Sequence, residues 1–404
     1  MTTPSAVLDG NRGDLIVYFA GSRWDGPPGH DRHMAEALSR FRPVLFVEPL
    51  VSALTRFNRP ELGKLLDRPR LQVVSPRLAH LVTPVVPGFS RPGVHRLVPP
   101  MVRRATRRAI AELYGSRARE PLAAVVCSRF GDPGSPLPAR RRVFYVTDDL
   151  VAGAGMVGLP RDWLRHEEAG SLRRADAVAV VSEAIQKRYA GEGVAAELIA
   201  NGCEPDAYAG VDEAPVPPGV TLPGPVVGLL GHVNDRIDLA LLEAVADTGS
   251  SLLIVGPVAP GYHAERFGAL TERPNVQWVG PKPYAEMPSY LRLIDVGLTP
   301  YADNEFNRAS FPLKTLEYLA AGRAVVATPL PAVTWLGTDL VSTASTPPEF
   351  AARVRAALAL PRTEELVARR RAFARGHSWD RRAEQLAALL GLGADALDPT
   401  GATP

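Results

Sequence analysis

Cysteine, lysine and long apolar runs are all scarce in this chain of 404 residues. The two cysteines, Cys127 and Cys203, lack metal-ligand spacing and are too few for a disulfide framework. No apolar run approaches the roughly 20 residues that span a bilayer. The segment Met1–Ser5 has neither the basic start nor the apolar core of a signal peptide. These absences predict a cytoplasmic protein in a reducing compartment.

Two binding patterns are also missing. The turn after the predicted strand 226–230 lacks the G-x-G-x-x-G spacing, and no acidic residue is well placed after it. This absence counts against a dehydrogenase. The acidic pair Asp148 and Asp149 does not form the D-x-D kind of divalent-metal cluster. The sequence therefore predicts no metal and no other cofactor.

The chain does have short apolar runs alternating with amphipathic stretches, which is typical of parallel sheets covered by helices. With 46% hydrophobic residues, it can build packed cores. Two α/β blocks are visible. Strands are predicted at 15–20, 44–47, 71–75, 123–127, 143–146 and 177–181 in the first block, and at 226–230, 252–255, 276–279, 296–299 and 324–327 in the second.

A passage rich in proline and glycine separates the two blocks and reads as a linker. Two doubly wound, Rossmann-like domains imply a central cleft, with ligands beyond the carboxyl ends of the strands. The predicted bounds are 1–210 for the first domain, 211–225 for the linker, 226–377 for the second domain, 378–391 for a helix that crosses back to the first domain, and 392–404 for a disordered tail.

The most informative segment runs from 310 to 328. Ser310 is predicted to cap a helix, Pro312 suits its first turn, and Gly322 ends it. Free N–H groups at this helix start, from Ser310 to Leu313, combine with the helix dipole to favour an anion such as a diphosphate.

Lys314 and Glu317 lie three residues apart and so share one face of this helix. The lysine suits a phosphate and the glutamate suits a ribose diol. The alternative is an ordinary surface ion pair. The chain has 4 lysines against 42 arginines, so a lysine here runs against a strong compositional preference.

Further candidates follow the first strand of the second block. Gly231 lets the backbone approach a phosphate, His232 lies next to it, and Arg236 can hold a phosphate as a fork. Taken alone, this turn is a weak signal.

In the first block, His30 follows a Gly- and Pro-containing loop and is a candidate acid or base near neutral pH. Asp148 and Asp149 follow a predicted strand and are candidates for a hydrogen bond to an acceptor hydroxyl or a donor sugar. The alternatives are a capping or loop role for the histidine, and a helix cap or solvated turn for the aspartates.

Positive charge is concentrated between residues 91 and 142, with twelve arginines against three acidic residues. Residues 81–100, just before and within it, are rich in proline, valine and leucine. A basic helix beside apolar loops suits an anionic membrane surface or a lipid-phosphate acceptor. The alternative is a solvated basic face; nucleic acid is disfavoured because no recognition motif accompanies the charge.

The second block resembles the nucleotide-sugar domain of retaining GT-B glycosyltransferases of family four, the glycosyl transferases group 1 type. The resemblance rests on 274–284, on Asp-Val-Gly-Leu-Thr-Pro at 295–300 and on Pro-Leu-Lys-Thr-Leu-Glu-Tyr-Leu-Ala-Ala-Gly at 312–322. The Gly-His-Val-Asn-Asp-Arg turn at 231–236 is similar to a branch that makes teichuronic acid and other cell-surface polysaccharides. In the first block, 145–149 and 181–183 resemble the same branch.

The resemblance implies a GT-B fold with an acceptor-binding first domain and a nucleotide-sugar-binding second domain. It implies that Glu317 binds the ribose, and that Lys314, Arg236 and the backbone of 310–313 meet the diphosphate. The implied reaction transfers a sugar to a hydroxyl acceptor with retention and without metal. The family pairs two glutamates, and the earlier position here is Ala309, so the donor sugar stays open.

Two alternatives remain at this point. A sugar-nucleotide epimerase has the same two-block architecture and needs no acceptor. A degenerate transferase that binds a partner is compatible with Ala309.

Overall fold

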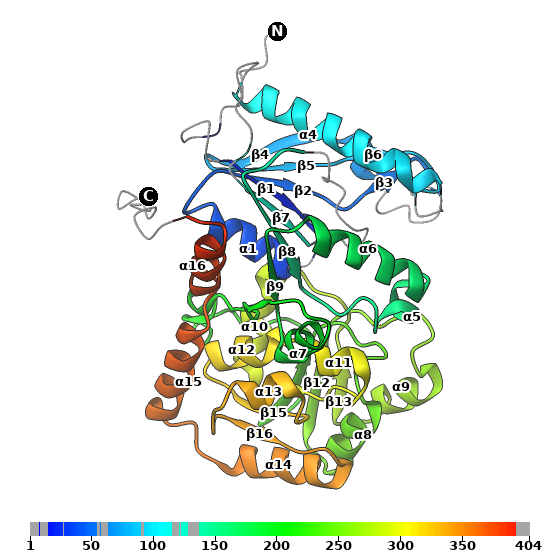
Figure 1. Cartoon of the computed structure of the whole chain (residues 1–404). Helices are drawn as coiled ribbons and strands as arrows, with labels where there is room; N and C mark the ends of the chain where they lie inside the picture. The colour runs from blue at the N-terminus through cyan, green and yellow to red at the C-terminus, as the bar shows by residue number, and fades with distance from the viewer. Residues whose placement is uncertain are drawn as a thin grey trace. The chain divides into compact units, whose positions relative to one another are not determined.

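The computed structural model describes residues 8, 15–26, 28–54, 57, 64–89, 93–114, 121, 123–127 and 137–392. These residues form two compact units. The first comprises the described residues of Met1–Val181, Gln186–Ile199 and Arg382–Pro404, and the second comprises Ser182–Ile185 and Ala200–Arg381. Figure 1 shows the helices and strands of both.

The first unit is built on an eight-stranded sheet of order β10-β9-β8-β7-β1-β2-β5-β4. All neighbours are parallel except the edge strand β4, which is antiparallel to β5. A small parallel pair, β3 and β6, accompanies it. The strands are β1 Ile16–Phe19, β2 Val44–Val47, β3 Val51–Ser52, β4 Leu71–Ser75, β5 Leu78–Leu81, β6 Pro84–Val85, β7 Ala123–Val126, β8 Arg141–Val146, β9 Ala177–Val180 and β10 Glu197–Leu198.

The parallel strands of this sheet follow the spatial order of a dinucleotide-binding fold, because β1 is central and the chain winds outward in both directions. Its helices are α1 His30–Leu38, η1 Lys64–Asp67, η2 Val94–Leu97, α4 Val98–Tyr114, α5 Ala154–Val157 and α6 Arg161–Arg174; α7 Glu183–Gly191 begins in the second unit and ends in the first.

The second unit has a six-stranded, wholly parallel sheet of order β13-β12-β11-β14-β15-β16. This is again the doubly wound order. The strands are β11 Val226–Leu230, β12 Ser251–Val255, β13 Val276–Trp278, β14 Ile294–Thr299, β15 Ala324–Ala327 and β16 Val341–Thr343. The helices are η3 Pro205–Tyr208, α8 Leu239–Asp247, α9 Ala264–Thr271, η4 Tyr284–Glu286, α10 Met287–Leu293, α11 Glu305–Ala309, α12 Leu313–Ala320, α13 Pro331–Trp335, α14 Pro347–Ala359 and α15 Glu364–Gly376; α16 Trp379–Leu389 begins in the second unit and ends in the first.

Close packing of α12 on the second sheet depends on one glycine. A Cβ added at Gly297, in β14, would lie 2.3 Å from the ring of Tyr318 in α12. The Tyr318 hydroxyl accepts from the amide of Leu230 at 2.8 Å and donates to the carbonyl of Gly228 at 3.2 Å. Helix α12 is thereby fixed against both central strands.

The predicted α/β class with two Rossmann-like domains is confirmed. The long segment of the second unit begins at Ala200. The linker was expected at 211–225, and these residues lie within the second unit. In the expected tail, Leu392 is buried, and 393–404 lie outside the described residues. Among the helices that the structure describes, none is long and apolar enough to cross a membrane.

Candidate active site

The start of α12 is organised differently from the prediction. Ser310 does not cap α12: it ends α11, and its hydroxyl donates to the carbonyl of Phe306 at 2.9 Å. The chain is extended from Ser310 to Pro312, and Pro312 takes the N-cap position with no side-chain hydrogen bond. Because no described side chain caps α12, its first N–H groups remain available to an anion.

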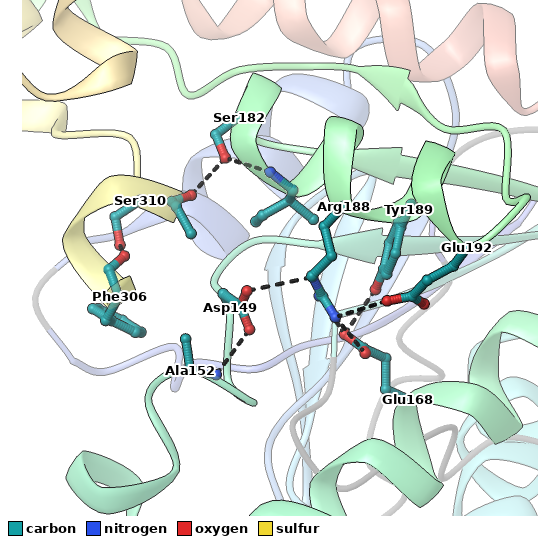
Figure 2. A network of polar contacts seen from close by, with 11 residues as sticks. Asp149, Ala152, Glu168, Ser182, Arg188, Tyr189, Glu192, Phe306 and Ser310 are labelled. Atoms are coloured by element: carbon teal, nitrogen blue, oxygen red, sulfur yellow. Dashed lines mark hydrogen bonds and ion pairs between the residues drawn. The ribbon is translucent and has the colours of Figure 1, made fainter. Parts of the chain in front are cut away.

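Two side chains from distant parts of the sequence hold the loop in front of α12. Ser182 donates to the carbonyl of Ala309 at 2.6 Å, and Asn201 donates to the carbonyl of Phe311 at 3.0 Å. Both are buried. Figure 2 shows Ser182 and Ser310 in this arrangement. The loop that presents the helix start is therefore fixed from outside its own segment.

Lys314 and Glu317 meet, as their spacing predicts. The Lys314 Nζ lies 2.7 Å from the Glu317 carboxylate. Glu317 is only 9% exposed, while the lysine side chain is 24% exposed. An ammonium has three donors, so the pair leaves two of them for a phosphate. Lys314 can therefore pair with Glu317 and bind a phosphate at the same time.

Two tyrosines adjoin Glu317, of which Tyr208 is buried and Tyr284 is half-buried. The hydroxyls of Tyr208 and Tyr284 lie 2.9 Å apart. Burial, and then the charge of Glu317, raises the pKa of both phenols. They are neutral at physiological pH and can donate to or accept from a diol beside the carboxylate. Tyr284 stands in the family-like segment 274–284, but its role depends on the distant Tyr208, which has no sequence signal.

The turn after β11 lies next to Lys314. Gly231 has φ +133°, and a Cβ there would lie 3.8 Å from Lys314 Cε. A Cβ added at Gly256 would lie 1.9 Å from the carbonyl oxygen of Gly231. The backbones at these two glycines are therefore in close contact. The neighbouring His232 is largely exposed, and its partial desolvation lowers its pKa. It is therefore neutral at pH 7 and can donate one hydrogen bond.

Arg236 is held in a fixed position by α11. Its Nε donates to the Oδ1 of Asn307 at 3.0 Å. The guanidinium lies over the rings of Tyr301 and Phe306, with its carbon 5.3 and 5.1 Å from their centroids. It forms no ion pair with any carboxylate of the described chain. Its two terminal nitrogens are therefore available to an anion.

Asn307 was not predicted. It is 1% exposed and also donates to the carbonyls of Arg236 and Ala302, at 2.9 and 2.8 Å. Its position depends on Asn304, whose side chain caps α11. The only sequence signal for Asn307 was its spacing of three residues from Asn304 at the start of a helix.

The family comparison bears on this unit. Residues 224–359, which contain the β11 turn, Arg236 and α12, match the family described as glycosyl transferases group 1. The resemblance of the second block to this family is thus confirmed for this segment.

One known protein is similar in sequence to this chain. TuaH of Bacillus subtilis (strain 168), named for a proposed glycosyltransferase step in teichuronic acid biosynthesis, is 31% identical over 224 residues. The match covers 51% of this chain and 56% of TuaH, so the chain spans about half the length of that relative.

Solved structures establish the GT-B fold. Sucrose-phosphate synthase from Thermosynechococcus elongatus has a TM-score of 0.70 at 17% identity, covering 93% of this chain and 98% of its own. Anabaena HepE, in complex with UDP and glucose, has a TM-score of 0.64 at 16% identity, covering 93% and 99%. At such identity the likeness shows the fold alone.

Outside the group 1 domain, the first-unit candidates lie near the ends of β1 and β8. His30 is the first residue of α1, with its ring 4.6 Å from that of Tyr145 and perpendicular to it. Asp148 is half-buried and lines a small cavity with Tyr145 and Thr147. These two candidates are thus placed at the carboxyl end of the sheet, where doubly wound folds bind ligands.

Asp149 has an evident structural role. It is 6% exposed, accepts from the amide of Ala152 at 2.9 Å, and lies 3.4 Å from Arg188 Nε. Arg188 also binds both oxygens of Glu168, at 2.9 and 3.0 Å. Figure 2 shows this network. Asp149 therefore stabilises a buried turn, whereas the alternative from the sequence was a helix cap or a solvated turn.

One cluster in the first unit has the residue types of a metal site. His30, Asp31 and Cys127 have ligand atoms within 4.8 Å of one another. However, Asp31 accepts from the hydroxyls of Tyr18 and Ser22 and from two backbone amides, and the Cys127 thiol donates to Tyr18. The cluster is a hydrogen-bond network that fixes the turn after β1.

Proposed function

We propose that the chain is a nucleoside-diphosphate-sugar-dependent glycosyltransferase that moves a hexose to a hydroxyl acceptor, with retention and without metal. The observation that carries the proposal is the uncapped start of α12, with Lys314 and Glu317 on its first turns in a group 1 domain. The second unit takes the donor and the first takes the acceptor.

The chemistry follows from where charge develops. As the bond to the anomeric carbon breaks, negative charge gathers on the leaving diphosphate. Lys314, Arg236 and the N–H groups at the start of α12, beginning at Leu313, stabilise that charge. Gly231 lets the diphosphate come close to the backbone because it has no side chain. His232 supplies a neutral donor beside them.

The nucleoside end is bound by the buried carboxylate. Glu317 accepts from the two ribose hydroxyls, and Tyr208 and Tyr284 complete this polar pocket. Ala309 places no carboxylate near the donor sugar, so sugar contacts come from other groups. HepE is a GT-B structure with bound UDP and glucose, which supports a nucleotide-sugar donor.

In the first unit, we propose that His30 and Asp148 contact the acceptor hydroxyl, while Asp149 acts through the turn that it holds. The acceptor is a glycan, a lipid-linked sugar or a secondary metabolite. The proposed location is the cytoplasm, at the inner face of the plasma membrane. The two free, buried thiols support a reducing compartment.

Nucleotide binding tests the proposal directly. Thermal unfolding is measured with UDP, GDP, dTDP, ADP and CDP in the presence of a chelator. A ligand at a hundredfold its Kd adds about 2.7 kcal/mol of stability. One nucleotide should stabilise the protein without metal. Failure of every nucleotide, or stabilisation that requires a divalent metal, contradicts the proposal.

The ribose role of Glu317 has a sharper test. Each ribonucleotide, UDP, GDP, ADP and CDP, is compared with its 2′-deoxy form on the wild-type chain and on Glu317→Gln. Loss of a hydrogen bond to a charged group costs about 1.5–3 kcal/mol, so the wild-type chain should prefer the ribose form by about tenfold or more. Glu317→Gln should lose this preference, whereas the exposed control Glu272→Gln should keep it. An unchanged preference in Glu317→Gln assigns the diol to another residue.

A further inference from the structure

Helix α4 of the first unit has two contrasting faces. One packs inward through buried residues: Val98, Val102, Thr106, Ala109, Ile110, Leu113 and Tyr114. The other carries four arginines, here called the arginine face: Arg103, Arg104, Arg107 and Arg108. Arg103 is half-buried and the other three are exposed. Figure 1 shows α4 running along β4, β5 and β6.

The arginine face differs in its charge pairing from several other exposed arginines of the described chain. Within the described ranges, no carboxylate forms an ion pair with any of its four guanidinium groups. Other exposed arginines of the chain are paired, for example Arg266 with Glu243, Arg308 with Asp303 and Arg369 with Asp339. Like charges three and four residues apart destabilise a helix. An external anion would relieve this repulsion.

An apolar hollow lies beside the arginine face. It has a volume of about 370 Å³, and Leu71, Leu81, Pro84 and Met101 line it from β4, β5, β6 and α4. Arg104 and Arg108 belong to its lining, together with one carboxylate, Glu112. A second, more open hollow of about 480 Å³ is lined by all four arginines. Cationic and apolar surfaces are therefore continuous here.

Exposed apolar side chains extend this surface. Val73 and Val74 of the edge strand β4 are 42% and 45% exposed, and Leu97, just before α4, is 52% exposed. No aromatic side chain of the described chain lines either hollow. Nucleic acids and glycans are commonly bound by aromatic stacking, whereas basic side chains beside aliphatic ones match the headgroup and acyl layers of a bilayer.

We infer that the arginine face and the adjoining apolar hollow form a docking surface for an anionic phospholipid bilayer. The guanidinium groups bind headgroup phosphates, and the aliphatic side chains enter the acyl boundary. This inference rests on the proposed function, because docking would bring the proposed enzyme to a lipid-linked acceptor. Its measurement does not depend on turnover.

The test is sedimentation of the full chain with phosphatidylcholine vesicles, with and without phosphatidylglycerol, at physiological salt. The triple variant Arg104→Gln, Arg107→Gln, Arg108→Gln is compared with a triple control of equal charge change at exposed residues of the second unit: Arg353→Gln, Arg355→Gln and Arg381→Gln. At the usual attraction per basic residue, the first triple should bind anionic vesicles about a hundredfold more weakly than the wild-type chain. The control should bind nearly as the wild type does.

Three results overturn the inference: no binding of the wild-type chain to anionic vesicles, equal loss in both triples, or displacement from vesicles by inorganic phosphate at constant ionic strength. The last would assign the surface to a soluble phosphate. Nucleotide-induced thermal stabilisation of the same triple variant is the folding control. If nucleotides stabilise it and vesicle binding is lost, the docking role holds; if no nucleotide stabilises even the wild type, only the proposed function fails.

Discussion

At the scale of the residue, Arg236 shows how an arginine can be kept ready for an anion. Its Nε is fixed by Asn307 and its plane by Tyr301 and Phe306. The side chain is therefore ordered before a ligand arrives, which lowers the entropy lost on binding. Asn307 acts through Arg236 and is a positioning residue.

We expect Asn307→Ala to lower turnover about tenfold or more, because misplacement of a positioned group is costly. It should also destabilise the second unit by about 1–3 kcal/mol, since the carbonyls of Arg236 and Ala302 each lose one of two donors and the side-chain bond to Arg236 Nε is lost. Steady-state kinetics and urea unfolding measure the two effects.

The double variant with Arg236→Ala separates positioning from stability. If Asn307 acts through Arg236, Asn307→Ala should reduce turnover little further once Arg236 is gone. Additive losses in turnover would mean that Asn307 contacts the substrate itself or acts by another route.

Residue roles were predictable from the sequence where they depend on local spacing. Lys314 and Glu317 meet because three residues on a helix make neighbours. Asn307, Tyr208 and Gly256 were missed because their partners lie 20 or more residues away in sequence. Such contacts have no local periodicity.

At the scale of the element, the start of α12 explains why the predicted Ser310 cap was wrong. The short helix α11 was not predicted, and Ser310 ends that helix instead of beginning the next. A five-residue helix produces too little periodicity to be distinguished from a loop. The strands were easier to predict because buried parallel strands are continuous apolar runs.

The contact between β14 and α12 yields a stability prediction. Gly297→Ala would place a methyl group 2.3 Å from the Tyr318 ring, and overpacking of this kind costs about 1–3 kcal/mol. Because the Tyr318 hydroxyl ties α12 to β11, the shift should also weaken nucleotide binding. Urea unfolding and nucleotide titration measure both effects.

The half-buried glycine Gly268, in α9, is the matched control. A Cβ there meets nothing within 4 Å, so Gly268→Ala should be neutral or stabilising, because alanine is the better helix former. Similar losses in the two variants would show that the Tyr318 contact does not limit packing.

At the scale of the whole molecule, the two doubly wound blocks follow from the alternation of apolar and amphipathic segments. The same alternation does not predict how the chain divides between the two units. Residues 182–185 belong to the second unit, and the described residues of 382–404 belong to the first. Such exchanges depend on tertiary contacts, which a sequence pattern does not encode.

The chain end makes the final prediction. In 382–392, Leu386 and Leu390 are buried, and the carbonyl of Leu389 accepts from Arg141 Nε at 3.2 Å. A chain that ends at Arg381 should lose about 3–6 kcal/mol from the two buried leucines. The loss should appear in the first unit, as lower amide protection by hydrogen exchange.

A chain that ends at Leu392 is the control and should keep wild-type protection. In the shorter chain, nucleotides should still protect the second unit, which holds the residues proposed to bind the donor. Uniform loss of protection across both units would mean that they unfold as one cooperative body.

The anchoring of the α12 loop by Ser182 and Asn201 bears on the design of chimeras. Both residues precede the matched segment 224–359. If segment 224–359 were exchanged for that of a relative at residue 224, its helix start would be held by a foreign serine and asparagine. Junctions at 181/182, 185/186, 199/200 and 381/382 would carry the anchors along with the domain they support. The second unit, together with the residues that anchor its helix start, is thus inherited in two separate pieces of sequence.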